Sequence, residues 1–308
     1  MLKVVEAFSG IGAQKQALEK LNIEHEIINT IEWDINAIYA YDIMHHNDNS
    51  PSKLSKHEII ERLANVTLSP DGKKPFSDNG LYRIKEEKLQ KLYAAIRRNN
   101  NLCDITQVSG DMIPDDTDLL TYSFPCQDLS IGSVWYNKDN DGIRKGAKTR
   151  SGLLWEIERI LRERIMINVP LPKFLLMENV NAITSPKHNP NFVQWQEELE
   201  SMGYTNKVYK GLNALDFGVP QSRSRTFMLS IRNKDIEPEE ISNLNYNIQS
   251  NLGDYLRFNH KEEIIEATPN YTPSRIKIYN QNRLLAKNGV VKADFTNTIS
   301  TKQDRNPN

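Results

Sequence analysis

Apolar residues gather in short runs along the N-terminal half of the chain, and their spacing alternates between that of strands and that of helices. Residues 2–8 form a run of strand length, and the apolar residues of 13–21 recur at helical spacing. A strand at 27–32 and a helix at 37–44 repeat this order. The pattern predicts an α/β fold with a doubly wound, mostly parallel, Rossmann-like sheet.

Further segments of both kinds continue to about residue 232, beyond which the alternation weakens and Asn, Ile and Lys become frequent. We predict strands at 119–124, 173–177, 204–212 and 226–231 and helices at 151–167 and 192–202. The loop-like residues after 46 and the turn signal at 69–72 predict an insertion over about 47–100 with helices of its own. This divides the chain into a first domain, residues 1–232, and a smaller region, 233–308.

Composition narrows the class of protein only moderately. Of the 308 residues 38% are hydrophobic, and no apolar run approaches the ~20 residues that span a bilayer, so we expect no membrane association. The net charge of −1 is not typical of nucleic-acid-binding domains, although basic residues are concentrated locally at 144–150. A second basic group at 83–98 is interrupted by Glu86 and Glu87, which favours a solvated helix surface.

The two cysteines, Cys103 and Cys126, are too few for a disulfide framework and belong to no zinc-type cluster. We therefore expect a cytoplasmic protein without a metal. Cys103 has no charged helper in the sequence that would activate its thiol and is interpreted as a core residue. Cys126 follows a predicted strand and Pro125, which fixes the backbone before it. This position suits a nucleophile exposed at the tip of a rigid element, and the alternative is a buried structural cysteine.

A glycine-rich turn, Phe8-Ser9-Gly10-Ile11-Gly12, follows the first predicted strand, and Glu32 lies 20 residues after Gly12. In dinucleotide-binding sheets an acidic residue at this separation accepts hydrogen bonds from ribose hydroxyls. The usual third glycine is missing, which favours an adenosine with a small tail, such as S-adenosylmethionine, over a dinucleotide. The alternative is a tight packing turn without a ligand.

Other polar or aromatic residues follow predicted strands, where open α/β sheets bind ligands. Trp33 is positioned either to stack on adenine or to fill the core. Asp104 is positioned either to accept a hydrogen bond from an adenine amino group or to cap the next turn. Glu178 ends an apolar strand and is either a buried functional acid or a solvent-facing cap. Arg223 and Arg225 are two residues apart, so on one strand their side chains would share a face. That face would belong either to a functional site or to the protein surface.

Taken in order, these segments resemble the DNA (cytosine-5)-methyltransferase family. The motifs are Phe8-x-Gly10-x-Gly12, Glu32-Trp33, Asp104-Ile105, Pro125-Cys126-Gln127, Gly152-Leu153-Leu154, Glu178-Asn179-Val180 and Gln221-Ser222-Arg223-Ser224-Arg225. Each motif is short, but seven in this order make a specific signal.

The resemblance implies S-adenosylmethionine as cofactor and double-stranded DNA as substrate, in DNA methylation of the kind found in restriction–modification systems. The implied cofactor-binding residues are Phe8, Gly10, Ile11, Gly12, Glu32, Trp33, Asp104, Ile105, Pro125 and Leu154. The implied catalytic residues are Cys126, Glu178, Arg223 and Arg225, and those implied for the substrate are Gln127, Asn179, Gln221, Arg144 and Lys145. Residues 233–308 would begin a target-recognition domain.

The implied chemistry starts with addition of the Cys126 thiolate to carbon 6 of cytosine, which activates carbon 5 towards the methyl donor. Glu178 would be protonated near ring nitrogen 3, and Arg225, alone or with Arg223, would hold the base. The base would have to leave the duplex, and the loop 128–150 would close over it.

The sequence departs from the family pattern near its C-terminus. The family has further motifs after its target-recognition region, commonly with an Asn-x-Val segment, and this sequence shows none before Asn308. The chain would then be a fragment, or the larger subunit of a split enzyme completed by a second polypeptide. The same motifs are also compatible with an RNA cytosine methyltransferase, and the Pro-Cys pair with a cysteine-dependent enzyme acting on free nucleotides.

Overall fold

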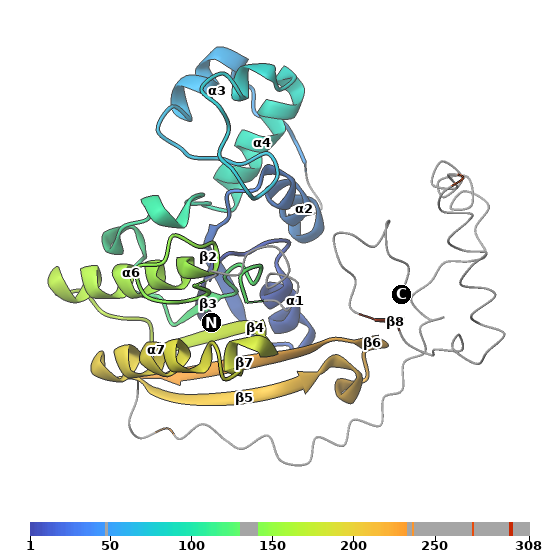
Figure 1. Cartoon of the computed structure of the whole chain (residues 1–308). Coiled ribbons are helices and arrows are strands. Elements are labelled where there is room, and N and C mark those ends of the chain that lie inside the picture. The colour runs from blue at the N-terminus through green and yellow to red at the C-terminus, as the bar shows by residue number, and fades with distance from the viewer. Residues whose placement is uncertain (47–48, 130–140, 233–235, 237–272, 274–295, 298–308) are drawn as a thin grey trace. The chain divides into compact units, whose positions relative to one another are not determined.

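The structure is a computed structural model that describes residues 1–46, 49–129, 141–232, 236, 273 and 296–297. Figure 1 shows the chain coloured by residue number. The chain divides into two compact units. The first unit comprises Met1–Lys210 and Thr226–Glu239, and the second comprises Gly211–Arg225 and Glu240–Asn308. The two units differ from the predicted division at residue 232 in the placement of Gly211–Arg225, so that division stays a prediction.

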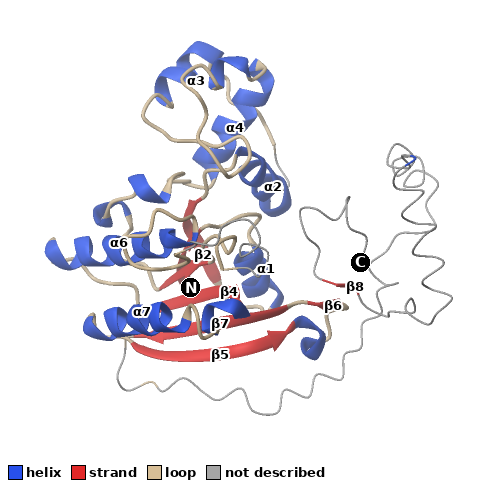
Figure 2. Cartoon of the chain, in the orientation of Figure 1, coloured by secondary structure: helices blue, strands red, loops and turns tan. Residues whose placement is uncertain are grey.

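A six-stranded sheet in the order β2-β1-β3-β4-β7-β5 forms the centre of the first unit (Figure 2). Its strands are β1 (Leu2–Ala7), β2 (His25–Ile31), β3 (Leu119–Tyr122), β4 (Phe174–Val180), β5 (Thr205–Asn213) and β7 (Ser224–Ile231). The first four strands in sequence pair in parallel. Because their apolar runs are nearly continuous, as in strands covered on both faces, these strands are recognisable in the sequence.

β7 runs antiparallel to both of its neighbours in the sheet, β4 and β5. The Arg232 amide, just after β7, donates to the Lys173 carbonyl just before β4 at 2.9 Å, so the end of β7 lies beside the start of β4. At the other end, the Thr226 hydroxyl donates to Asn181, just after β4, at 3.0 Å. The sheet is therefore mixed and mostly parallel, which confirms the predicted fold class.

Helices flank the sheet. In this part of the chain they are α1 (Ala13–Lys20), α2 (Ile35–His46), α6 (Leu154–Met166) and α7 (Asn189–Ser201). The apolar faces of α6 and α7 bury a core with the strands, in which Trp195 packs edge-on against Tyr122 and Trp155. The Trp195 indole donates to the Tyr122 hydroxyl at 3.1 Å, so this polar pair is satisfied inside the core.

The insertion builds a second core. Its helices α3 (Lys56–Arg62) and α4 (Glu86–Arg98) bury Ile59, Leu89 and Leu92 against Ile35 and Ile38 of α2. This confirms that the insertion has helices of its own. The basic residues of α4 lie mostly on its solvated face, as predicted, because the core takes the other face.

Arg98, at the end of α4, differs from the other basic residues of this helix because it binds a buried carboxylate. Its guanidinium forms two hydrogen bonds, at 3.0 and 2.8 Å, with the fully buried carboxylate of Asp42 in α2. A buried carboxylate requires such a partner, so this pair fastens the insertion to α2.

The second unit is described only in part. It contains the 3-10 helix η6 (Ala214–Phe217) and the strand β6 (Gln221–Ser222). β6 pairs in parallel with β8 (Thr296–Asn297). The Asn213 side chain accepts from the amides of Leu215 and Arg223, and so holds the two ends of this segment together.

Candidate active site

The carboxyl ends of β1, β3 and β4 lie next to one another. Ala7 is in register with Tyr122, and Tyr122 with Met177, so Phe8, Ser123 and Glu178 continue three neighbouring strands. Side-chain bonds join the segments: the Ser123 hydroxyl donates to the Phe8 carbonyl at 3.4 Å, and the Asn179 amide to the Phe124 carbonyl at 3.0 Å. The structure thus brings the glycine turn, the cysteine loop and the Glu178-Asn179 pair to one edge of the sheet.

Gly10 and Gly12 of the turn differ in what surrounds the position of a side chain. Gly12 has φ +80°, and a Cβ there would lie 2.2 Å from His45 Nε2 and 2.7 Å from the Tyr41 ring, so α2 packs directly against its backbone. Gly10 has φ +53°, and a Cβ there would meet nothing within 4 Å. The packing interpretation therefore holds for Gly12, whereas Gly10 borders open space that a ligand can enter. Phe8 also has a positive φ, +55°, and Ile11 is exposed.

Glu32 is held at the same place by backbone groups. Its Oε2 accepts from the Gly10 amide at 3.0 Å and its Oε1 from the Asp34 amide at 2.8 Å. Burial raises the pKa of this carboxyl above its ordinary value, against the effect of those two bonds. A carboxylate in this situation gains from further donors, such as ribose hydroxyls, so the turn and Glu32 fit the adenosine part of a nucleoside cofactor.

Glu6 stabilises the segment around the glycine turn through hydrogen bonds, and the sequence analysis did not identify this residue. This residue lies inside β1 and is fully buried. Its Oε1 accepts from the Lys15 amide at 2.8 Å and its Oε2 from the Tyr41 hydroxyl at 2.7 Å. Glu6 thus joins β1 to both α1 and α2. An acidic residue inside an apolar strand was the available signal, because burial of a carboxyl requires partners.

The cysteine loop is fixed from both sides of Cys126 by Ser151, which is fully buried in the 3-10 helix η4 (Ser151–Leu153). The Ser151 hydroxyl donates to the Pro125 carbonyl at 2.7 Å and accepts from the Asp128 amide at 3.3 Å. The Asp128 carboxylate accepts from the Ser151 amide at 3.0 Å. We name these three bonds the Ser151 clasp. The Cys126 thiol itself is partly exposed and Gln127 is exposed.

The segment around Glu178 corrects one expectation. The strand was predicted to end at Glu178, but β4 continues to Val180, because Glu178 and its neighbours keep the strand alternation of exposure. Glu178 is partly exposed, whereas Asn179 is 2% exposed. The Asn179 side chain bonds to the Phe124 carbonyl and to the Val180 amide. Its amide therefore positions the cysteine loop, and a direct substrate contact stays a prediction.

Several predicted cofactor residues are buried or engaged locally. Asp104 caps the 3-10 helix η2 (Ile105–Gln107) by accepting from Thr106, and its contact with adenine stays a prediction. Ile105 and Leu154 are 4% and 0% exposed, so both side chains pack in the core, and their contacts with the cofactor also stay predictions. Trp33 is partly exposed, and its carbonyl accepts from the Ser69 amide.

Cys103 is confirmed as a core residue. It is 2% exposed, and burial raises the pKa of its thiol to about 12. A thiol in this condition is not a nucleophile at neutral pH.

The basic residues of the segment 144–150 differ in the contacts that they make. Lys145 lies 2.8 Å from both Glu158 and Glu198 and 5.0 Å above the Trp155 ring. Burial by itself would lower the pKa of Lys145, but the two carboxylates outweigh it and raise the pKa above its ordinary value. Because its charge is already neutralised, Lys145 is poorly placed to act as a phosphate ligand. Arg144 pairs with Asp141 but is well exposed. Residues 130–140 of the expected closing loop lie outside the described residues.

The arginine segment belongs to the second unit, and its strand assignment is corrected. Gln221 lies in β6, Arg223 falls at the break between β6 and β7, and Arg225 lies in β7. The two arginines therefore do not follow each other along one strand. The Arg225 guanidinium donates to the Ser224 carbonyl at 2.8 Å. Their position in the pocket stays a prediction.

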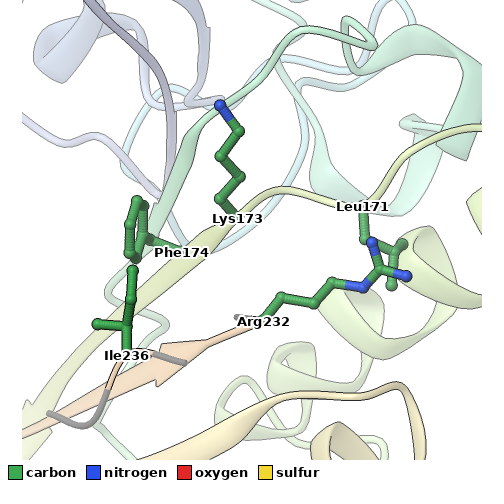
Figure 3. A pocket seen from close by; sticks show the side chains of 5 residues that line it. All are labelled: Leu171, Lys173, Phe174, Arg232 and Ile236. Atoms are coloured by element: carbon green, nitrogen blue, oxygen red, sulfur yellow. The ribbon is translucent and has the colours of Figure 1, made fainter. Parts of the chain in front are cut away.

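A cavity of about 260 Å³ lies away from this edge (Figure 3). It is lined by Leu171, Lys173, Phe174, Arg232 and Ile236. These residues flank the start of β4 and the end of β7, whereas Glu178 lies near the opposite end of β4. The cavity therefore is not part of the candidate site.

Metal-binding clusters and membrane-spanning helices are both absent from the described part of the chain. No group of His, Cys, Asp or Glu among these residues could hold a metal ion. Within the same residues, no helix has the length and apolar character to cross a membrane.

The sequence matches the family described as C-5 cytosine-specific DNA methylase over residues 81–306. The chain belongs to this family, which confirms the resemblance drawn from the motifs. It is 43% identical over 243 residues to the orphan methyltransferase M.SssI of Spiroplasma monobiae, covering 77% of this chain and 61% of that protein. It is 38% identical over 237 residues to the type II methyltransferase M2.ScrFI of Lactococcus lactis subsp. cremoris, covering 76% and 62%.

The chain thus spans about three fifths of the length of these relatives. Among solved structures, the S. pombe Dnmt2 methyltransferase matches with a TM-score of 0.50 at 21% identity, over 85% of this chain and 62% of that one. This likeness supports the fold.

Proposed function

We propose that the protein transfers a methyl group from S-adenosylmethionine to carbon 5 of cytosine in duplex DNA, through a transient bond to Cys126. The observation that carries the proposal is the convergence of three strand ends. The glycine turn, the loop with the partly exposed Cys126, and Glu178 lie at these strand ends, in a chain of the cytosine-5 methylase family. The proposed place of action is the cytoplasm, where the two thiols stay reduced.

The glycine turn and Glu32 are the residues proposed to hold the cofactor. Gly10 leaves space for its approach, and Glu32 accepts hydrogen bonds from the ribose. When bound, S-adenosylmethionine supplies an electrophilic methyl group. Phe8 and Trp33 are proposed to contact its adenosine from the two strand ends.

Cys126 is proposed as the nucleophile. Its thiolate forms a carbon–sulfur bond to carbon 6 of the cytosine, and the electrons of the 5,6 double bond move so that carbon 5 becomes nucleophilic. After carbon 5 has taken the methyl group, a base removes its proton, the double bond re-forms and the thiolate leaves. The methyl group that carbon 5 gains replaces the proton that it loses, and that proton carries away the positive charge of the sulfonium donor, so atoms and charge balance.

Glu178 is proposed to donate a hydrogen bond to ring nitrogen 3, where negative charge develops. Arg225, alone or with Arg223, is proposed to hold the base and stabilise the adduct. A stacked cytosine cannot reach Cys126, so the base must leave the helix, at a cost of a few kcal/mol.

The test of this proposal is methyl transfer by the purified chain to cytosine-containing duplex DNA. We expect Cys126→Ala to abolish transfer while the thermal unfolding curve is unchanged, and Cys103→Ala, the matched control, to keep activity. Duplex DNA with 5-fluorocytosine at the target should form a stable adduct with the wild type, because fluorine cannot leave as the proton does. Substantial turnover by Cys126→Ala would refute the covalent mechanism.

A further inference from the structure

The insertion carries a loop, Ser69–Lys74, that is fastened to the candidate site rather than to its own helices alone. The Ser69 amide donates to the Trp33 carbonyl at 2.8 Å, and the Ile35 amide donates back to the Ser69 carbonyl at 3.0 Å. The Asn36 side chain donates to the Pro70 carbonyl at 2.9 Å. The loop is therefore attached to the segment that follows Glu32.

The same loop also contacts the segment after the cysteine loop. The Arg150 guanidinium donates to the Gly72 carbonyl at 2.7 Å. Arg150 directly precedes Ser151, whose side chain fixes the backbone around Cys126. Gly72 has φ +65°, and a Cβ there would lie 3.0 Å from Asp34 Oδ2, so the loop is closely packed at this point.

The loop has a defined internal conformation. Asp71 Oδ1 accepts from the amides of Lys73 and Lys74 at 3.0 and 3.3 Å. The Ser69 hydroxyl donates to the Lys74 carbonyl at 2.6 Å. These bonds fix the backbone of both lysines, so the loop presents two neighbouring cations from a rigid support.

Both lysine side chains are free for a partner within the described structure. Lys73 and Lys74 are exposed, and no described carboxylate lies within ion-pair distance of their ammonium groups, which is true of Lys148 as well. The loop and the residues that contact it contain three cations, Lys73, Lys74 and Arg150, and two carboxylates, Asp71 and Asp34. Asp71 is already engaged by backbone amides and Asp34 by Asn36.

We propose that the Ser69–Lys74 loop binds the phosphate backbone of the duplex DNA substrate and extends the basic segment 144–150 onto the insertion. The inference rests on the proposed function. The loop is bonded both to the residues after Glu32 and to Arg150, so a duplex delivering a base to Cys126 passes its backbone nearby. Adjacent ammonium groups on a fixed backbone suit neighbouring phosphates, which are contacted without regard to base sequence.

The test is the salt dependence of DNA binding by the full chain, measured by fluorescence anisotropy with a labelled duplex between about 50 and 200 mM salt. Each phosphate contact contributes about −0.9 to the slope of log affinity against log salt, so Lys73→Ala/Lys74→Ala should flatten the slope by about 2. The loss of affinity should be equal for duplexes of unrelated sequence. Lys73→Glu/Lys74→Glu should weaken binding further.

The matched control is Lys20→Ala/Lys85→Ala, which removes two exposed lysines of the same unit elsewhere and should leave the slope unchanged. Thermal unfolding of each variant checks that the fold persists. If the wild type binds DNA and the Lys73/Lys74 variants keep its slope, the inference is overturned and the proposed function stands. If the wild type binds no duplex at all, both are overturned.

Discussion

The glycine turn and the cysteine loop meet at one edge of the sheet but are held in different ways. Gly12 is fixed by close packing, since His45 and Tyr41 occupy the space a side chain would need. The backbone around Cys126 is fixed by hydrogen bonds of the Ser151 clasp. The turn should therefore be sensitive to added volume, and the loop to the loss of polar groups. Substitutions at the turn should therefore act mainly on stability, and substitutions at the loop on the reactivity of Cys126, the proposed nucleophile.

The largest expected effect is that of Gly12→Ala. The added Cβ collides with His45 and must adopt φ +80°, so we expect a loss of about 3 kcal/mol in the free energy of unfolding. Gly10→Ala, where space is open, should lose only the conformational part, about 1–2 kcal/mol. Urea unfolding measures both. Combining Gly12→Ala with His45→Ala should recover part of the loss, and equal losses for the two glycines would contradict the packing argument.

Ser151→Ala should have the next largest effect. It leaves the Pro125 carbonyl and the Asp128 amide without their partner, at a cost of about 1–3 kcal/mol in unfolding free energy. It should also change the rate at which iodoacetamide alkylates Cys126, because the backbone beside the thiol is released. Buried Cys103 serves as the internal reference for global unfolding. An unchanged alkylation rate would show that the clasp does not position the thiol, and Ser77→Ala, at an exposed serine, is the control for stability.

Tyr41→Phe should cost less. It removes one of two hydrogen bonds to the buried Glu6 carboxyl, worth about 1–2 kcal/mol in unfolding free energy. Because that bond lowers the pKa of Glu6 against the effect of burial, the variant should raise the pKa further. Thermal unfolding compared with Tyr82→Phe, a change at an exposed tyrosine, isolates the effect. Equal melting temperatures for the two variants would mean that Glu6 does not depend on Tyr41.

The smallest effect concerns pH. Burial lowers the pKa of His45 and of His188 below the ordinary value of 6.5, so the folded state favours their neutral forms. The unfolded chain then binds more protons, and this contribution to stability is present above pH 6.5 and is lost as the pH falls below it. Melting temperatures should decline between about pH 7 and 5.5. His45→Gln should reduce the decline, and an unchanged pH dependence in that variant would contradict the assignment.

The sequence predicted the sheet well because its signals are local. Nearly continuous apolar runs marked β1, β3 and β4, and the helical spacing after Gly12 marked α1. The motif order gave the family, which the comparison confirmed. Cys103 was assigned to the core because no charge near it in the sequence could activate its thiol, and its burial agrees.

What the sequence did not reveal are contacts between distant segments. Ser151 lies 25 residues from Cys126 and belongs to no recognised polar motif, so the clasp has no local signal. Lys145 looked available because Glu198, in α7, is far away along the chain. Arg223 and Arg225 would share a face only on one strand, and their alternation does not reveal the break between β6 and β7. Tertiary contacts decided each of these cases.

The two outer strands of the sheet, β2 and β5, differ in what the described structure shows along them. Along β2, the chain returning from the insertion supplies partners: the Leu102 amide donates to the Thr30 carbonyl at 2.9 Å, and the Asn100 side chain to the Ile28 carbonyl at 3.2 Å. At the opposite side β5 is the last strand of the sheet, and it carries Lys207 and Lys210. Charged lysines discourage strand-to-strand self-association. Apolar residues at these two positions would remove that charge from β5, whereas the protection of β2 comes from backbone and side-chain hydrogen bonds and would be unaffected.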